Sequence, residues 1–130
     1  MKQERVNMVL LNLSHHTRVA EVAFRAYAHG YTRGCAHNQN IDPSTPVDRL
    51  AAMLADKLRV LGYKLAHPDW YGVDLFERLH TELVTLDAAL PTRTTWKAET
   101  GRELLHRRLP NILATIIWNL RTLIDLMKVA

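Results

Sequence analysis

The sequence predicts an all-α protein: a single-domain bundle of four to five helices around an apolar C-terminal helix. Three observations support this fold. Apolar residues recur every three or four positions in several long segments, strand-type alternation is absent, and the C-terminal segment has the widest apolar face. The chain has 130 residues, 48% of them hydrophobic and 23% charged, which is typical of one globular domain. We therefore expect one helical domain over residues 1–130.

The first helix is expected over about residues 3–29, either unbroken or interrupted near residues 14–17. Its apolar stripe follows helical spacing and comprises Val6, Leu10, Leu13, Thr17, Ala20, Phe24, Tyr27 and Tyr31. At 1.5 Å per residue an unbroken helix would be about 40 Å long. That length exceeds what a small four-helix core covers, so a partner, or a second copy forming a homodimer through this helix, would cover the free end.

Two further helices are expected, over residues 46–61 and 73–90. The first of them has Thr45 as N-cap and Pro46 at its first position, where the missing N–H does no harm, and Gly62 is expected to end it. Pro91 ends the other. The residues from Tyr63 to Gly72 are interpreted as a connection.

The last helix is expected over residues 101–127. A Thr100-Gly101-Arg102-Glu103 capping box begins it. Its wide apolar face includes Leu113, Ile116 and Leu120, which predicts a central position in the bundle. Pro110 lies inside it and predicts a kink, because its ring clashes with the carbonyl four residues earlier.

Charge is distributed unevenly along the chain. Residues 1–35 carry a net charge of +3, residues 36–90 carry −3 and residues 91–130 carry +4. Such a chain can present a basic surface to an anionic partner, or its basic and acidic helices can pair with one another. The single cysteine, Cys35, fits a reducing compartment. We expect a cytoplasmic protein with no membrane partner and no cofactor.

Two Glu-x-x-His pairs are present, Glu77 with His80 and Glu103 with His106. This spacing occurs in di-iron four-helix bundles, where two further helices each add a carboxylate, here Glu21 and Asp56. Metal ligands must project into the bundle interior. Both glutamates of the pairs lie more than about 100° from the centres of their apolar stripes. We therefore interpret the pairs as surface neighbours and assign no metal ligands.

The stretch Leu79-His80-Thr81-Glu82-Leu83, with Leu86-Asp87, resembles the first acidic motif of the MazG-like nucleotide pyrophosphohydrolases. The resemblance covers about a tenth of the chain and implies magnesium held by paired acids on two helices. The following helix departs from the family pattern, because Glu103 is followed by no acid until Asp125. A magnesium site would then lack half of its oxygen ligands. A degenerate nucleotide hydrolase is kept as an alternative function.

The sequence contains no set of polar residues that identifies a reaction, so no catalytic residue is assigned. The preferred hypothesis is a non-catalytic interaction or regulatory protein that binds and modulates a larger protein or ribonucleoprotein assembly, a class that includes phage-type inhibitors of a host system. Nucleic-acid binding through a basic face is a second alternative. Tyr, Trp and Arg dominate interface energetics. The candidate partner-binding residues are Arg18, Arg25, His29, Trp70, Tyr71, Arg102, Arg107 and Arg108.

Overall fold

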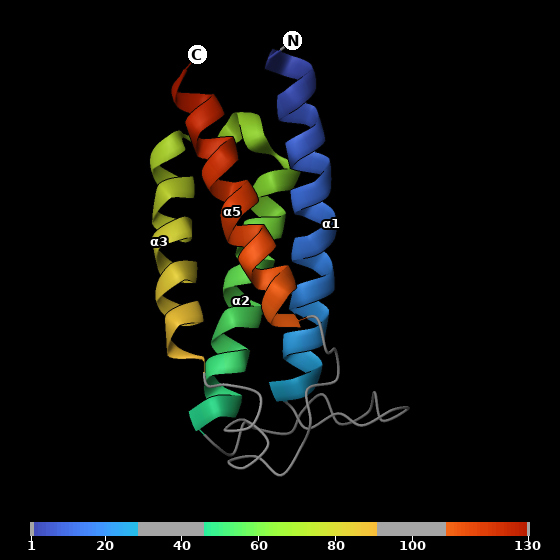
Figure 1. Cartoon of the computed structure of the whole chain (residues 1–130), viewed down its shortest axis with the longest axis vertical. Coiled ribbons are helices and arrows are strands. Elements are labelled where there is room, and N and C mark those ends of the chain that lie inside the picture. The colour runs from blue at the N-terminus through green and yellow to red at the C-terminus, as the bar shows by residue number, and fades with distance from the viewer. Residues whose placement is uncertain (1, 29–45, 91–108, 130) are drawn as a thin grey trace.

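The computed structural model describes residues 2–28, 46–90 and 109–129. These ranges form four long helices, α1 (Lys2–Ala28), α2 (Pro46–Ala66), α3 (Val73–Ala89) and α5 (Leu109–Lys128), and a short 3-10 helix η2 (Pro68–Trp70). Successive helices run in opposite directions, and both ends of the chain lie at the end of the bundle where η2 joins α2 to α3 (Figure 1). The all-α bundle predicted from the sequence is confirmed.

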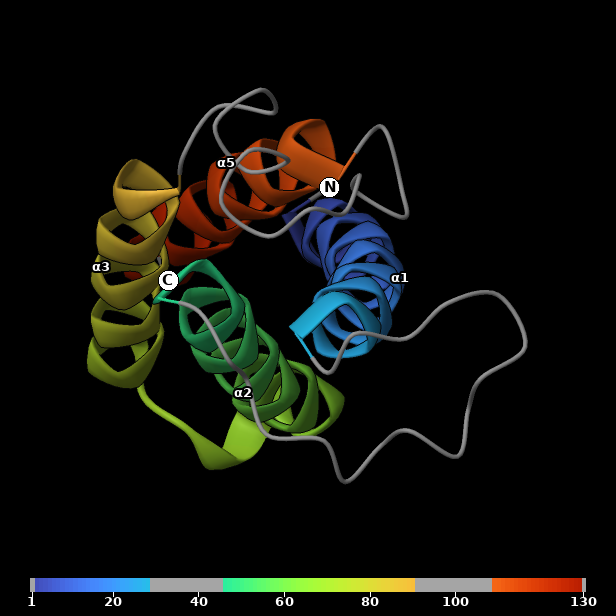
Figure 2. The same cartoon turned by 90° about the horizontal axis from the view of Figure 1, so that it is seen from below.

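The four helices occupy the corners of a square when viewed along the bundle (Figure 2). α1 packs on α2 and α5, and α3 packs on α2 and α5. This arrangement corrects the prediction that the C-terminal helix is central, because α5 forms one corner and the core lies between all four helices. The largest fully buried side chains are Tyr27, Phe24, Phe76, Leu13, Leu54, Leu58, Leu61, Leu83, Leu113 and Ile116.

α1 is continuous and shows no break at Ser14–Thr17. Its stripe is buried at Leu13, Thr17, Ala20, Phe24 and Tyr27. Towards the N-terminus the stripe is partly buried and packs against the core through Val6, Val9 and Leu10. The core therefore covers more of α1 than we expected from the length of this helix. The exposed apolar residues of the N-terminal half, Met8 and Leu11, lie off the stripe.

α2 begins at Pro46 and continues to Ala66, so the prediction that it ends before Gly62 is wrong. Gly62 lies inside the helix, and the chain turns only where the His67 N–H donates to the Lys64 carbonyl oxygen at 3.1 Å. The reason is burial: Leu65 is 3% exposed, so another turn of helix buries one more leucine. This gain exceeds the cost of about 1 kcal/mol for a helical glycine.

α3 starts after Gly72, its N-cap, and ends at Leu90, whose N–H donates to the Asp87 carbonyl oxygen at 3.1 Å. α5 is described from Leu109 onwards, and Pro110 is the second described residue of that helix. The predicted part of this helix before Leu109, the Thr100 capping box and the Thr45 cap all lie outside the described residues. No described helix is long and apolar enough to cross a membrane.

Candidate functional site

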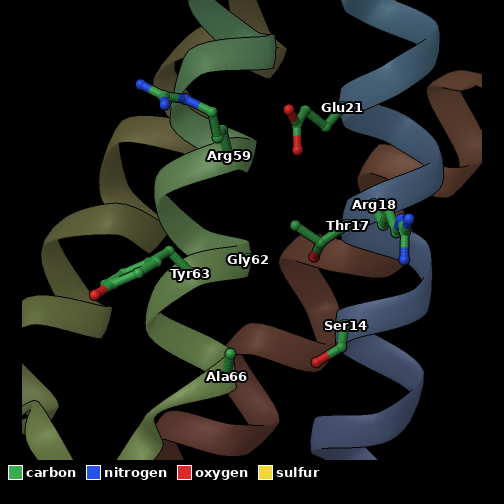
Figure 3. Close-up of a pocket in the computed structure, with 8 residues that line it drawn as sticks. All are labelled: Ser14, Thr17, Arg18, Glu21, Arg59, Gly62, Tyr63 and Ala66. Carbon is green, nitrogen blue, oxygen red and sulfur yellow. The ribbon is translucent and has the colours of Figure 1, made fainter.

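A groove runs between α1 and α2 on the surface of the bundle (Figure 3). Its volume is about 310 Å³. Both helices contribute side chains, which are Ser14, Thr17, Arg18 and Glu21 from α1 and Arg59, Gly62, Tyr63 and Ala66 from α2. We call these eight residues the α1–α2 groove. The groove contains one of the sequence-predicted partner residues, Arg18, in a setting of polar and cationic groups.

Small side chains form the floor of the groove. Thr17 extends from α1 towards Gly62 of α2, and Ser14 lies beside Ala66 one turn further along (Figure 3). A Cβ atom added to Gly62 would lie 3.8 Å from the Thr17 Cγ2 atom, an ordinary van der Waals separation. Gly62 is therefore not required by a close approach of the two helices, since an alanine would fit there.

The Thr17 hydroxyl is unusual among the helical threonines of the described residues. Thr81, Thr85, Thr115 and Thr122 each donate to the carbonyl oxygen four residues earlier, at 2.9–3.2 Å. Thr17 is 1% exposed, and its Oγ1 atom has no hydrogen-bond partner in the described structure. A buried hydroxyl without a partner costs about 1–3 kcal/mol. The floor of the groove thus holds a polar group whose hydrogen-bonding capacity is unused.

Two cations at the groove have no counter-ion among the described residues. Arg18 and Arg59 make no hydrogen bond or ion pair with any described residue. The predicted partner residue Arg25 is placed differently: its Nη2 atom lies 3.2 Å from the Asp56 carboxylate of α2 and 3.6 Å from the Glu21 carboxylate. Arg25 therefore pairs with Glu21 and Asp56, and Arg18 and Arg59 have no ion pair with a described residue.

An aromatic cluster continues from the groove to the end of the bundle. The Tyr63 ring contacts the His67 ring at a centroid distance of 5.3 Å, and the His67 ring stacks on Trp70 at 4.0 Å. The Lys64 ammonium lies 4.1 Å from the centroid of the Tyr71 ring, a cation–π geometry. Trp70 is 67% exposed, whereas Tyr71 is half-buried. Of the two predicted aromatic anchors, only Trp70 presents most of its ring to solvent.

Most exposed large apolar side chains of the described residues lie on α1, α2 and η2. Ten large hydrophobic residues are exposed in the described part of the chain, and seven of them lie on α1, α2 or η2. They are Met8, Leu11 and Val22 on α1, Met53, Val60 and Tyr63 on α2, and Trp70 on η2. Leu11, Arg18 and Val22 are spaced seven and four residues apart, which places them on one face of α1.

The residues of the metal hypotheses are engaged in other contacts. Glu77 forms an ion pair with Lys128 of α5, and Glu82 forms one with Lys57 of α2. Glu21 and Asp56 are held by Arg25. Within residues 2–28, 46–90 and 109–129, no three His, Cys, Asp or Glu side chains are grouped so as to hold a metal ion. Glu103 and His106 lie outside these ranges.

A second groove, between α3 and α5, has a volume of about 270 Å³. We call its lining residues, His80, Asp87, Ala114, Ile117, Trp118 and Arg121, the α3–α5 groove. Trp118 is 74% exposed. Burial, followed by the charge of Arg121, lowers the pKa of His80, and the nearby Asp125 opposes this effect. Burial raises the pKa of Asp87. Burial therefore favours the neutral forms of His80 and Asp87 in this groove.

The structure brings Arg18 into one groove with Arg59 and Tyr63, and ring contacts connect Tyr63 to Trp70. Four predicted partner residues, His29, Arg102, Arg107 and Arg108, lie outside the described residues. Sequence reasoning missed Arg59, Tyr63 and Trp118. The spacing of Arg59, Tyr63 and Ala66 would have indicated a helix face, but only if α2 had been continued past Gly62.

The fold and the groove together define an antiparallel four-helix bundle with a polar and cationic groove on one wall. Comparison of the chain with known protein families, with curated protein sequences and with solved structures finds no match.

Proposed function

We propose that this chain is a non-catalytic interaction protein that binds a larger protein assembly and modulates it. The contact is made by the α1–α2 face, which we define as Leu11, Arg18 and Val22 of α1, Arg59 and Tyr63 of α2, and Trp70 of η2. One observation carries the proposal: four of the ten exposed large hydrophobic side chains of the described residues, Leu11, Val22, Tyr63 and Trp70, belong to this face. Exposed apolar surface of this kind is typical of sites that bind another protein.

The composition of the face is that of a binding hot spot. Trp, Tyr and Arg are the residues that contribute most to interface energetics, because they combine large contact areas with directed polar groups. Trp70 and Tyr63 are present here, with two arginines that have no counter-ion in the described part of the chain. An interface built on them would lose most of its affinity when one or two central residues are removed.

A protein fits this face better than a nucleic acid does. A phosphate backbone is bound by clustered cations. Here the carboxylates of Glu21 and Asp56 lie among the arginines, and aliphatic side chains such as Leu11 and Val22 are exposed beside them. These features weaken contact with phosphates and favour contact with apolar and acidic side chains of a protein.

The test is affinity capture with the whole chain, followed by quantitative mass spectrometry and reconstitution with the purified partner. We expect a stoichiometric protein whose recovery falls at least about tenfold when Leu11→Glu is combined with Arg18→Ala, since such changes at hot spots each cost about 1–2 kcal/mol or more. The matched control is Val84→Glu with Arg78→Ala, which places the same types of change on exposed positions of α3. Equal recovery by both double variants would refute the proposal.

Two further measurements separate the alternative occupants. Recovery that disappears after nuclease treatment would identify a nucleic acid as the partner. Light scattering of the purified chain tests the expected homodimer through α1: a dimer that Leu11→Glu dissociates would show that a second copy covers this face.

A further inference from the structure

Two residues at the floor of the α1–α2 groove are poorly explained by folding alone. Gly62 lies inside a helix, where glycine is unfavourable, although the space above it admits a Cβ atom. Thr17 buries a hydroxyl without a partner, although the other four helical threonines of the described ranges bond to their own helix. The two residues face each other (Figure 3). Such a pair is expected where a ligand group enters and needs both space and a hydrogen bond.

The charge at the groove indicates which ligand group enters. Arg18 and Arg59, one from each helix, have no ion pair among the described residues. The one acidic residue lining the groove, Glu21, is held by Arg25 at 3.6 Å. Guanidinium and hydroxyl groups together donate the hydrogen bonds that a carboxylate accepts. Glu21 opposes a dianionic phosphate more than a singly charged carboxylate, because repulsion grows with ligand charge.

We propose that the α1–α2 groove binds an acidic side chain, Asp or Glu, of an extended or helical segment of a partner protein. The Arg59 guanidinium points away from Thr17 in Figure 3, so binding requires this side chain to turn over the groove. The carboxylate then lies between Arg18 and Arg59 and accepts a hydrogen bond from the Thr17 hydroxyl, which a rotation about χ1 turns towards the space above Gly62. Apolar residues flanking the acid contact Tyr63 and Leu11. This inference rests on the proposed function only in that the groove and the α1–α2 face share Arg18, Arg59 and Tyr63.

The experiment is selection from a random-peptide display library against the whole chain, with affinities of the enriched peptides measured by fluorescence polarisation. We expect enriched sequences that share an Asp or Glu beside apolar residues. Replacing that acid by its amide should weaken binding about tenfold or more, as charge-assisted hydrogen bonds predict. The amide substitution should have little further effect in Arg59→Gln, which would show that the acid and Arg59 are coupled.

Two variants separate a binding role from a structural one. Thr17→Val is isosteric and should weaken peptide binding about fivefold, the equivalent of one hydrogen bond. Gly62→Ala should weaken it by at least a similar factor, because the methyl group fills the floor. Neither variant should lower the melting temperature, so lost binding cannot be ascribed to unfolding. Thr115→Val and Arg78→Gln are matched controls at exposed positions outside the groove and should bind as the wild type does.

Three outcomes would overturn the inference: enriched peptides without an acidic residue, peptides that bind Thr17→Val and Gly62→Ala as tightly as the wild type, or no enriched peptide at all. Each is distinguishable from failure of the proposed function. If Leu11→Glu with Arg18→Ala still abolishes capture of the partner, the interaction face stands and only the carboxylate site is wrong.

Discussion

The two interhelical grooves have similar volumes, about 310 Å³ between α1 and α2 and 270 Å³ between α3 and α5, but they differ in how their charges are satisfied. In the α3–α5 groove Arg121 donates to Asp125 at 2.9 Å. In the α1–α2 groove Arg18 and Arg59 have no such partner within residues 2–28, 46–90 and 109–129, and the buried Thr17 hydroxyl has none there either. Unused hydrogen-bonding groups, rather than groove size, therefore distinguish the candidate site.

The charges on the α3 side of the bundle connect neighbouring helices. Lys57 pairs with Glu82 between α2 and α3, and Lys128 pairs with Glu77 between α5 and α3. These side chains are about a third or more exposed, and such pairs contribute at most about 1 kcal/mol each. They connect neighbouring helices, whereas Arg18 and Arg59 of the α1–α2 groove make no ion pair with a described residue.

The largest effects on stability should come from substitutions in the core, which the α1–α2 and α3–α5 sides of the bundle share. Phe24 on α1 and Phe76 on α3 are fully buried in the same cluster. Each Phe→Ala change should lower the free energy of unfolding by about 3–5 kcal/mol, because it removes apolar contacts and leaves a cavity. Urea unfolding followed by circular dichroism and by tryptophan fluorescence measures this. Met53→Ala, at an exposed position, should stay within about 0.5 kcal/mol.

If the α1–α2 and α3–α5 sides of the bundle unfold as one cooperative unit, each variant shifts a single unfolding transition. Circular dichroism and tryptophan fluorescence then report the same transition. Trp70 lies beside the α1–α2 groove, and Trp118 lies in the α3–α5 groove. Two separate transitions in Phe24→Ala or in Phe76→Ala would show that the two sides unfold independently, and the single-domain description would then be wrong.

Removal of the Thr17 hydroxyl should have the next largest effect on stability. It should raise the free energy of unfolding, whereas the core substitutions lower it. Thr17→Val removes a buried polar group without a partner, so the free energy of unfolding should rise by about 1 kcal/mol or more. The matched change Thr115→Val on α5 removes a satisfied hydrogen bond of 2.9 Å at an exposed position and should change stability by less than about 0.5 kcal/mol. Urea titrations of both variants provide the comparison. Destabilisation by Thr17→Val would mean that its hydroxyl is satisfied in solution.

Alanine substitutions at two glycines should change the stability of the fold in opposite directions. Gly62→Ala should stabilise by about 0.5–1 kcal/mol, because the position is helical and the added Cβ meets only Thr17 Cγ2 at 3.8 Å. Gly72 is the N-cap of α3, a position where alanine is unfavourable, so Gly72→Ala should destabilise by a few tenths to about 1 kcal/mol. Thermal unfolding of the two variants measures the contrast. A loss of stability in Gly62→Ala would show that the helices approach more closely than the structure indicates.

Much of the fold follows from the sequence because helical periodicity is a local property. The positions of Leu13, Phe24, Leu83 and Leu120 on apolar stripes predict their burial, and each is buried. The square arrangement does not follow, because a stripe does not specify which helix it faces. The width of the α5 stripe suggested a central helix, whereas α5 forms one corner and packs on α1 and α3.

The candidate site was only partly predictable. Arg18 and Trp70 were identified as residue types suited to binding, but the local rule that glycine ends a helix hid the rest of the groove. Gly62 was interpreted as a helix end, which separated Arg59 from Tyr63. The pairing of Arg25 with Asp56 joins residues 31 positions apart, and the orientation of the Thr17 hydroxyl depends on packing. These features need the tertiary structure.

The smallest expected effect is on the dependence of stability on pH, and it belongs to the α3–α5 groove. Burial and Arg121 lower the pKa of His80 in the folded chain, while Asp125 opposes this and Asp87 lines the same groove. Since the unfolded chain then binds the proton more readily, stability falls as the pH drops below the ordinary histidine pKa of 6.5. His80→Gln should reduce the loss of stability between pH 7 and pH 5, by roughly a few tenths of a kcal/mol, because the side chain is only partly buried.

Asp87 provides the control for this measurement, because its pKa is shifted in the opposite direction to that of His80 and affects stability in a different pH range. Its pKa is raised by burial, so the folded chain binds the proton more readily and stability decreases as the pH rises above the ordinary value of 3.8. Asp87→Asn should therefore stabilise the chain at pH 7 and leave the His80-dependent loss of stability towards pH 5 in place. If the six other histidines caused the whole loss, His80→Gln would have the same pH dependence as the wild type, and the α3–α5 groove would have no part in it.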